Sequence, residues 1–221
     1  MICYASRTGT KKNLKVLRDN GWRLMLSATG VWRTEGFPYA IDNGAWTTHQ
    51  QGQPFDRLKF LQIVSAFGEN ADFIVIPDVV AGGRRSLDFS VEWLPTLTGK
   101  TKTPLLLPVQ DGMTPKDVEP VIRGWPAIGG IFVGGSTEWK VSTIPAWGQF
   151  GYNHGFYVHV GRVNTKSRLA LCQASAISSI DGSGPSRFSI AGEKMSKWWT
   201  QKSLVLFQTL KGDYKWSANV S

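Results

Sequence analysis

The fold of this chain is decided by residues 104–134, which have the sequence PLLLPVQDGMTPKDVEPVIRGWPAIGGIFVG. The apolar run at 104–110 predicts a strand, because it is short and is bounded by proline and glycine. Thr114 follows as an N-cap with proline at the first helical position, which predicts a helix over 115–124. A second apolar run at 127–134 predicts another strand. The order strand, helix, strand indicates the α/β class.

The same alternation extends along the whole chain. We expect strands at 2–5, 23–27, 39–42, 72–77, 104–110, 127–134, 156–161 and 176–181. We expect helices at 11–20, 56–69, 86–97, 115–124, 138–150 and 165–174, with little helix between the second and third strands. This pattern favours a compact (β/α)8 TIM-like barrel, a single domain over residues 1–221 with a C-terminal helix at 200–210. An open doubly wound sheet is the alternative.

The composition excludes several classes of protein. Of the 221 residues, 42% are apolar and 19% are charged, which is ordinary for a globular domain and argues against disorder. Cys3 and Cys172 are too few for a disulfide framework or a cysteine-rich zinc site. No apolar stretch approaches the roughly 18 residues of a membrane span, and the N-terminus does not resemble a signal peptide. We therefore expect a cytoplasmic protein with no membrane contact, no metal and no cofactor.

The charge balance points to a polyanionic partner. The chain has 25 Lys and Arg against 16 Asp and Glu, a net charge of +9. Basic side chains that neutralise phosphates release counterions, which favours nucleic-acid binding. The ten tryptophans can stack on bases. The alternative is a solubilising surface charge around a tryptophan-rich core.

Carboxylates recur at the predicted strand ends, where a βα barrel places its chemistry. They are Asp42, Asp78, Asp111 and Asp181. Their convergence would cost free energy through mutual repulsion. Glycosyl chemistry requires such a cluster, with one carboxylate as nucleophile and another as general acid or base. Taken singly, each aspartate has a turn-forming role as its alternative.

Two further strand ends carry candidate groups. The glycine-rich end of the sixth strand, GGIFVGGS at 129–136, can form a phosphate cradle of backbone N–H groups. The seventh strand carries His159 and Arg162, and the alternative for His159 is an inward-pointing core residue. The chain has no G-x-S-x-G motif, so a Ser-His-Asp hydrolase is disfavoured.

Five of these stretches together resemble a known family in their order and spacing. They are DNGAW at 42–46, Asp78 at the next strand end, VQDG at 109–112, GGIFVGG at 129–135 and DGSGPSR at 181–187. They are similar to D-S-G-G-[FY]-Q, a base-recognition aspartate, V-Q-G-G, G-G-L-A-V-G-E and D-C-V-L-P-T-R of the tRNA-guanine transglycosylase superfamily. Enzymes of that superfamily exchange a guanine in nucleic acid for a 7-deazaguanine on a (β/α)8 barrel.

The resemblance implies a role for each matching residue. Asp181 would be the nucleophile that holds the sugar covalently, and Asp42 would take the ring proton of the incoming base. The base edge would be read by Asp78, Gln110 and the backbone of Gly129 and Gly130. The base would be sandwiched by Trp46 and His159. Backbone phosphates would be bound by Arg162 and Arg187.

The sequence departs from the family in three places. The family's zinc site needs several cysteines and a histidine after the nucleophile, and no Cys or His follows Asp181. Asp111 replaces the second glycine of V-Q-G-G. The chain is also much shorter than the tRNA enzymes, so the closer resemblance is to the DpdA-type 7-deazaguanine DNA transglycosylases of bacteria and phages.

We therefore expect a transferase that exchanges guanine in DNA for a preQ0-type base in a bacterial or phage-infected cell. Three alternatives stay open: a tRNA-guanine transglycosylase, an N-glycosylase or nucleosidase that hydrolyses the same bond, and a non-catalytic nucleic-acid-binding barrel. A homo-oligomer or an accessory protein is compatible with the sequence.

Overall fold

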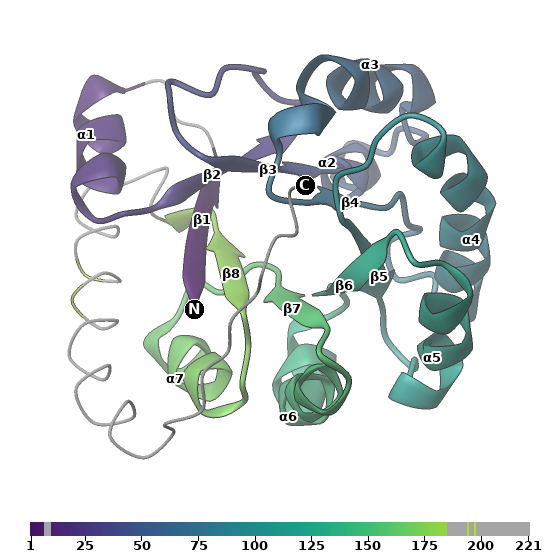
Figure 1. Cartoon of the computed structure of the whole chain (residues 1–221). Coiled ribbons are helices and arrows are strands. Elements are labelled where there is room, and N and C mark those ends of the chain that lie inside the picture. Colours follow the sequence, from purple (N-terminus) through teal and green to yellow (C-terminus); the bar gives the residue numbers. More distant parts are fainter. Residues whose placement is uncertain (7–9, 185–193, 195–196, 198–221) are drawn as a thin grey trace.

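A computed structural model describes residues 1–6, 10–184, 194 and 197. In this part of the chain, eight parallel strands close into a barrel in sequence order within one α/β domain (Figure 1). The strands are β1 (Ile2–Ser6), β2 (Arg23–Ser27), β3 (Tyr39–Asp42), β4 (Ile74–Val75), β5 (Leu105–Val109), β6 (Ile128–Val133), β7 (Tyr157–Val160) and β8 (Ser179–Gly182). β1 pairs with both β2 and β8, so the predicted closed barrel is confirmed and the open sheet is wrong.

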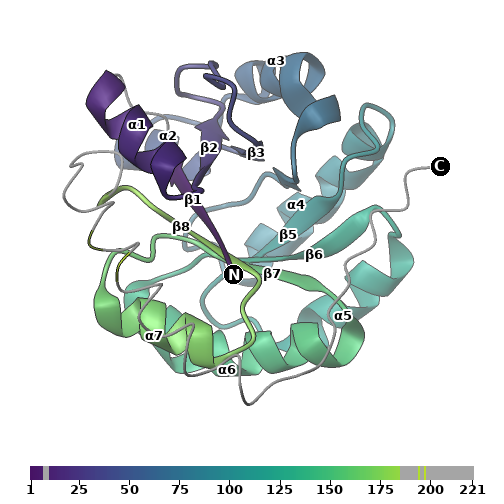
Figure 2. The same cartoon turned by 60° about the vertical axis from the view of Figure 1, so that its left-hand side comes forward.

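The described helices surround the barrel (Figure 1, Figure 2). They are α1 (Lys11–Asp19), α2 (Ala45–Gln50), α3 (Arg57–Phe67), the 3-10 turn η1 (Gly68–Asn70), α4 (Arg84–Thr98), α5 (Pro115–Gly124), α6 (Thr137–His154) and α7 (Lys166–Ala174). No helix joins β2 to β3, as predicted, whereas α2 after β3 was not predicted. The helix predicted at 200–210 lies outside the described residues. Within those residues, none of the helices has the length and apolar character needed to cross a membrane.

The core has two layers, because side chains of a barrel strand alternate between the interior and the helices. The interior is filled by Tyr4, Met25, Ala40, Phe73, Val75 and Leu106. A larger layer packs the strands against the helices and contains the buried Trp22, Trp93 and Trp147. These tryptophans are therefore structural, whereas Trp46 is 40% exposed and available for stacking.

Candidate active site

A pocket of about 700 Å³ opens where the strands of the barrel end. The predicted site residues that line it are Asp42, Trp46, Asp78, Gln110, Arg162 and Asp181. Because parallel strands present their carboxyl ends at one mouth, residues more than a hundred positions apart meet there. Arg187, which was predicted to bind phosphate, lies outside the described residues.

Asp181 is held by one oxygen only. Its Oδ1 lies 3.0 Å from Nε2 of His159 and accepts the backbone N–H of Arg162 at 3.2 Å. Its Oδ2 has no hydrogen-bond partner among the described residues, and the side chain is 19% exposed in the pocket. A carboxylate fixed through one oxygen, with the other available, has the geometry of a nucleophile.

His159 holds Asp181 from the barrel interior. Its Nδ1 lies 2.7 Å from the Ser179 hydroxyl, and the ring stacks on Phe132 with 5.0 Å between centroids. An Nε2–H that donates to Asp181 leaves Nδ1 to accept from Ser179, so the two contacts agree on one tautomer. The ring is fully buried and offers no face to a base. The predicted sandwich with Trp46 is therefore corrected: His159 points into the barrel interior, and Phe132 lines the pocket instead.

Asp78 lies in a network of amide groups. Nδ2 of Asn43 donates to Asp78 Oδ1 at 2.8 Å, and Nε2 of Gln110 donates to Oδ2. Oε1 of Gln110 accepts the backbone N–H of Gly135 at 3.0 Å. Burial raises the pKa of Asp78, against the hydrogen bonds from Asn43 and Gln110, which lower it. Asn43 was not predicted as a site residue, although it stands in the DNGAW stretch.

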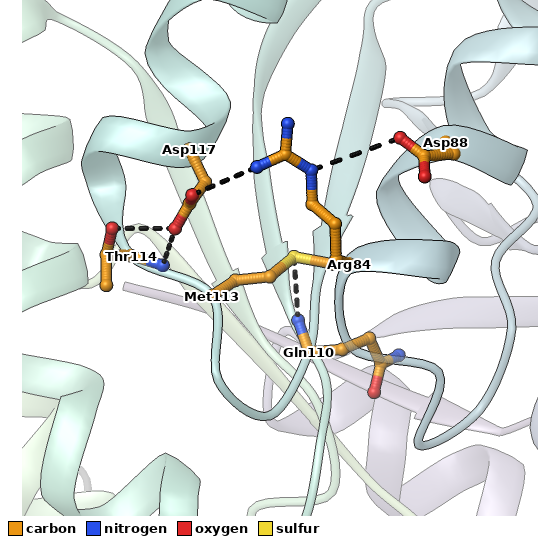
Figure 3. Close-up of polar contacts among 6 residues, drawn as sticks. All are labelled: Arg84, Asp88, Gln110, Met113, Thr114 and Asp117. Atoms are coloured by element: carbon orange, nitrogen blue, oxygen red, sulfur yellow. Dashed lines mark hydrogen bonds and ion pairs between the residues drawn. The ribbon is translucent and has the colours of Figure 1, made fainter.

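The β5–α5 connection fixes the position of Gln110 (Figure 3). The Gln110 backbone N–H donates to the sulfur of Met113 at 3.4 Å. Thr114 caps α5 as predicted, and its N–H and hydroxyl donate to Asp117 at 2.8 and 2.7 Å. Arg84, in the first turn of α4, pairs with Asp117 at 3.2 Å. These contacts tie the connection that carries Gln110 to α4 and α5, while the Gln110 side chain itself is held by Asp78 and Gly135.

Asp42 lies at the end of β3, and its Oδ2 accepts the backbone N–H of Gly44 at 3.0 Å. Gly44 has φ 83°, a left-handed conformation that disfavours other residues. Burial and the negative charge of Asp181 raise the pKa of Asp42 to about 7, against the hydrogen bond from Gly44. Asp42 can therefore give and take a proton near neutral pH.

The fourth carboxylate at this mouth belongs to Asp111. Its Oδ2 accepts the backbone N–H of Ser136 at 2.7 Å. Burial would raise the pKa of Asp111, but the hydrogen bonds from Ser136 outweigh it and the pKa is lowered. Asp111 is thus an ionised group that fixes the start of α6, rather than a proton donor.

Arg162 packs against Trp46 in the lining of the pocket. The Cζ atom of Arg162 lies 4.0 Å from the centre of the Trp46 ring, within the range of a cation–π contact. The guanidinium also donates to the carbonyl of Gly135. Arg162 has φ 60°, which is strained for a residue with a side chain. In this conformation the backbone N–H of Arg162 donates to Asp181 and its side chain lies over Trp46.

The structure does not bring Gly129 and Gly130 to this pocket. Both lie near the start of β6, and Gly129 lines a separate cavity at the opposite mouth of the barrel. A Cβ at Gly130 would overlap the Tyr157 carbonyl, so this glycine serves the close packing of β6 on β7. The glycines at the pocket are Gly134 and Gly135. A strand rises about 3.3 Å per residue, so five positions separate the two pairs by about 16 Å along β6 and its end.

Comparisons with known proteins leave the family open. No family model matches the sequence, and no curated protein is similar to it. Among the described residues, no three His, Cys, Asp or Glu side chains are arranged to hold a metal ion.

Proposed function

We propose that the protein is a nucleic-acid guanine transglycosylase, which exchanges guanine in DNA for a 7-deazaguanine base of the preQ0 type. The observation that carries the proposal is the pair of unlike carboxylates at one mouth. Asp181 has one anchored and one available oxygen, and Asp42 has a pKa raised to about 7. When the surroundings of two carboxylates at one site differ in this way, one can act as the nucleophile and the other as the general acid or base.

In the first half of the reaction, Oδ2 of Asp181 attacks C1′ of the target nucleotide. The bond from C1′ to the guanine nitrogen breaks, and its electron pair leaves with guanine, which takes a proton from Asp42. A covalent Asp181–sugar ester remains. The transition state resembles an oxocarbenium ion, as in retaining glycosidases.

In the second half, ionised Asp42 removes the ring proton of the incoming base. The base nitrogen attacks C1′, and Asp181 leaves as a carboxylate. Both carboxylates return to their starting protonation states. Two displacements at one carbon restore the original configuration.

The base edge is read by Asp78 and Gln110, with Asn43 as support. Each Asp78 oxygen accepts one amide donor and retains acceptor capacity for N–H groups of guanine. A base without matching donors would leave the buried carboxylate poorly paired, which gives strong discrimination. The base stacks on Trp46, and the Arg162 guanidinium moves aside to admit it.

DNA is proposed over tRNA because the sequence lacks the cysteines and histidine of the zinc segment found in the tRNA enzymes. The target base must be flipped out or single-stranded, because it cannot be reached inside a duplex. The net charge of +9 supplies phosphate contacts that offset the cost of flipping.

The test is a base-exchange assay with radiolabelled guanine. The purified protein is incubated separately with DNA and with unmodified tRNA, and label in the nucleic acid is counted. Incorporation into DNA alone, lost in Asp181→Asn, is the expected result. Label in tRNA would overturn the choice of DNA as substrate, and release of free guanine without incorporation would identify a hydrolase. Binding without either reaction would overturn the enzyme and leave a nucleic-acid-binding barrel.

A further inference from the structure

Exposed basic side chains surround the pocket on four of the described helices. These residues, here called the basic rim, are Lys11, Lys12, Arg85, Lys116 and Lys166. None of them forms an ion pair with another described residue. Each follows a pocket-lining residue by six positions or fewer, namely Ser6, Ala81, Asp111 or Arg162. Because α1, α4, α5 and α7 follow β1, β4, β5 and β7, their first turns lie at the mouth where the strands end, so the basic rim borders the pocket on several sides.

The stability of the helices does not account for the basic rim. A helix start carries a partial positive charge, where acidic residues are favourable and basic residues are not. The first turns of α1, α4 and α7 contain no acidic residue. In α5 the acidic residue is Asp117, which is engaged by Thr114 and Arg84. The basic rim therefore carries charge that the fold leaves unneutralised.

Basic residues elsewhere in the molecule are more often neutralised. Arg23 pairs with Asp72 at 2.5 Å at the opposite mouth of the barrel. Arg123 pairs with Glu119 at 2.7 Å on α5. Lys100 and Lys102 are exposed near the opposite mouth without an ion pair to another described residue, so they offer a matched control.

The charges at the pocket are arranged in two levels. The interior carries carboxylates, including the partly buried Asp42 and the buried Asp78, while the basic rim lies around them on exposed helix starts. The carboxylates repel phosphate and accept a neutral base, and the basic rim attracts phosphate. A nucleotide with its base extruded has this same order, a neutral base below two charged phosphodiesters.

We infer that the basic rim binds the sugar–phosphate backbone of a nucleic-acid strand on both sides of the nucleotide in the pocket. The inference rests on the proposed function for its class of ligand. The contacts are electrostatic and sequence-independent, so they position the strand without selecting its sequence.

The test is the salt dependence of oligonucleotide binding by the full chain. A fluorescently labelled single-stranded DNA of about 20 nucleotides is titrated at several KCl concentrations, and binding is followed by anisotropy. Two rim variants, Lys12→Ser with Lys166→Ser and Arg85→Ser with Lys116→Ser, each remove two charges. Lys100→Ser with Lys102→Ser removes the same charge at the opposite mouth. Thermal unfolding verifies that all three variants are folded.

Affinity falls as salt rises, and each phosphate contact on a single strand adds about 0.7 to the steepness of log affinity against log salt. Each rim variant should therefore make this dependence less steep by about 1.4. We expect affinity near 0.1 M salt to fall about tenfold, and the control to change by less than about twofold. An equal loss in the control would show that only net charge matters and would overturn the inference. Unchanged binding in the rim variants would do the same.

The outcome separates this inference from the proposed function. In the base-exchange assay, the rim variants should raise KM for DNA and leave kcat unchanged. Rim-dependent binding without base exchange would refute the transglycosylase and leave the basic rim as a nucleic-acid surface. Base exchange by a protein whose rim variants bind DNA like the wild type would refute the basic rim and leave the enzyme.

Discussion

The two mouths of the barrel differ in size and in the way their charges are paired. The mouth at the start of the strands opens to the larger cavity, about 1220 Å³, against about 700 Å³ at the ends of the strands. At the larger cavity, Asp72 uses both oxygens, one with Arg23 at 2.5 Å and one with the Tyr4 hydroxyl at 2.9 Å. At the smaller pocket, Asp181 keeps an oxygen without a partner among the described residues. Incomplete pairing, rather than volume, distinguishes the candidate active site.

Incomplete pairing has a cost in stability. Asp42, Asp78, Asp111 and Asp181 share one pocket with a single described arginine, Arg162. Burial, and then repulsion from Asp181, raise the pKa of Asp42. A fold selected for stability alone would pair these groups, as Arg23 and Asp72 are paired. Local conflicts of this kind are expected where a protein does chemistry.

The largest effect is expected from Asp181→Asn, compared with Asp72→Asn at the other mouth. The amide cannot form the sugar ester, so base exchange should fall by at least about 10³-fold while the fold is kept. Asp72→Asn should leave exchange within about threefold and lower the free energy of unfolding by about 1–2 kcal/mol, because Arg23 loses its partner. Labelled-guanine incorporation and urea unfolding measure both variants. Retained exchange in Asp181→Asn would refute the nucleophile.

A second comparison uses the two pairs of glycines in β6 and its end. A Cβ at Gly134 would lie 2.9 Å from Nε2 of Gln110, whereas a Cβ at Gly129 would meet only Cβ of Pro104, at 3.1 Å. Gly134→Ala should therefore push Gln110 away from Asp78 and lower kcat/KM for exchange by about 100-fold. Gly129→Ala should change it by less than about threefold. The reverse order of effects would restore the predicted role of Gly129.

These glycines show how far the sequence could locate the site. The alternation of strands and helices predicted the barrel, and the strand ends predicted which carboxylates converge. The motif match placed the base at Gly129 and Gly130, because similarity of letters does not record the direction of a strand. The predicted strand over 127–134 already ended at Gly134, so strand direction was the signal that would have identified Gly134 and Gly135 as the glycines at the pocket.

Other features depend on packing that a sequence pattern does not contain. The strand expected at 72–77 is reduced to Ile74–Val75, although Asp72, Phe73 and Ile76 still form backbone hydrogen bonds with β3 or β5. The helix α2 begins after Gly44, which has a left-handed conformation. It has only six residues, which are too few to show the periodic apolar pattern of a helix. The place of the His159 side chain in the barrel interior depends on the register of β7 with β8, in which His159 lies opposite Ser179.

A smaller effect is expected from Trp46→Leu, compared with Tyr152→Leu. Both side chains are exposed, but Trp46 lines the pocket and Tyr152 lies on α6 away from it. Base–aromatic stacking contributes about 1–3 kcal/mol, so Trp46→Leu should raise KM for the incoming base about 10- to 30-fold with a smaller change in kcat. Tyr152→Leu should leave KM unchanged. Equal KM values for both variants would remove Trp46 from base binding.

The smallest effect is the most direct test of the difference between the two mouths, because the sign of the stability change should reverse. The pKa of Asp42 is about 7 in the folded protein, against an ordinary value of 3.8. Between these values the folded state holds a proton that the unfolded chain has lost, so this group lowers stability as pH rises from about 4 to 7, with no further change above 7. Asp42→Asn should therefore raise the free energy of unfolding by about 1 kcal/mol at pH 8, and by less at pH 5.

Asp72→Asn removes an ion-paired carboxylate and should destabilise the protein at pH 8, whereas Asp42→Asn removes one that forms no ion pair with another described residue and should stabilise it. Urea unfolding of both variants and the wild type at the two pH values measures the four differences. The same Asp42→Asn protein should lose base exchange, since its amide cannot carry the proton between the two bases. Loss of stability in both variants at pH 8 would mean that Asp42 is paired as well as Asp72 is. The contrast in charge pairing would then no longer mark the strand-end mouth as the active site.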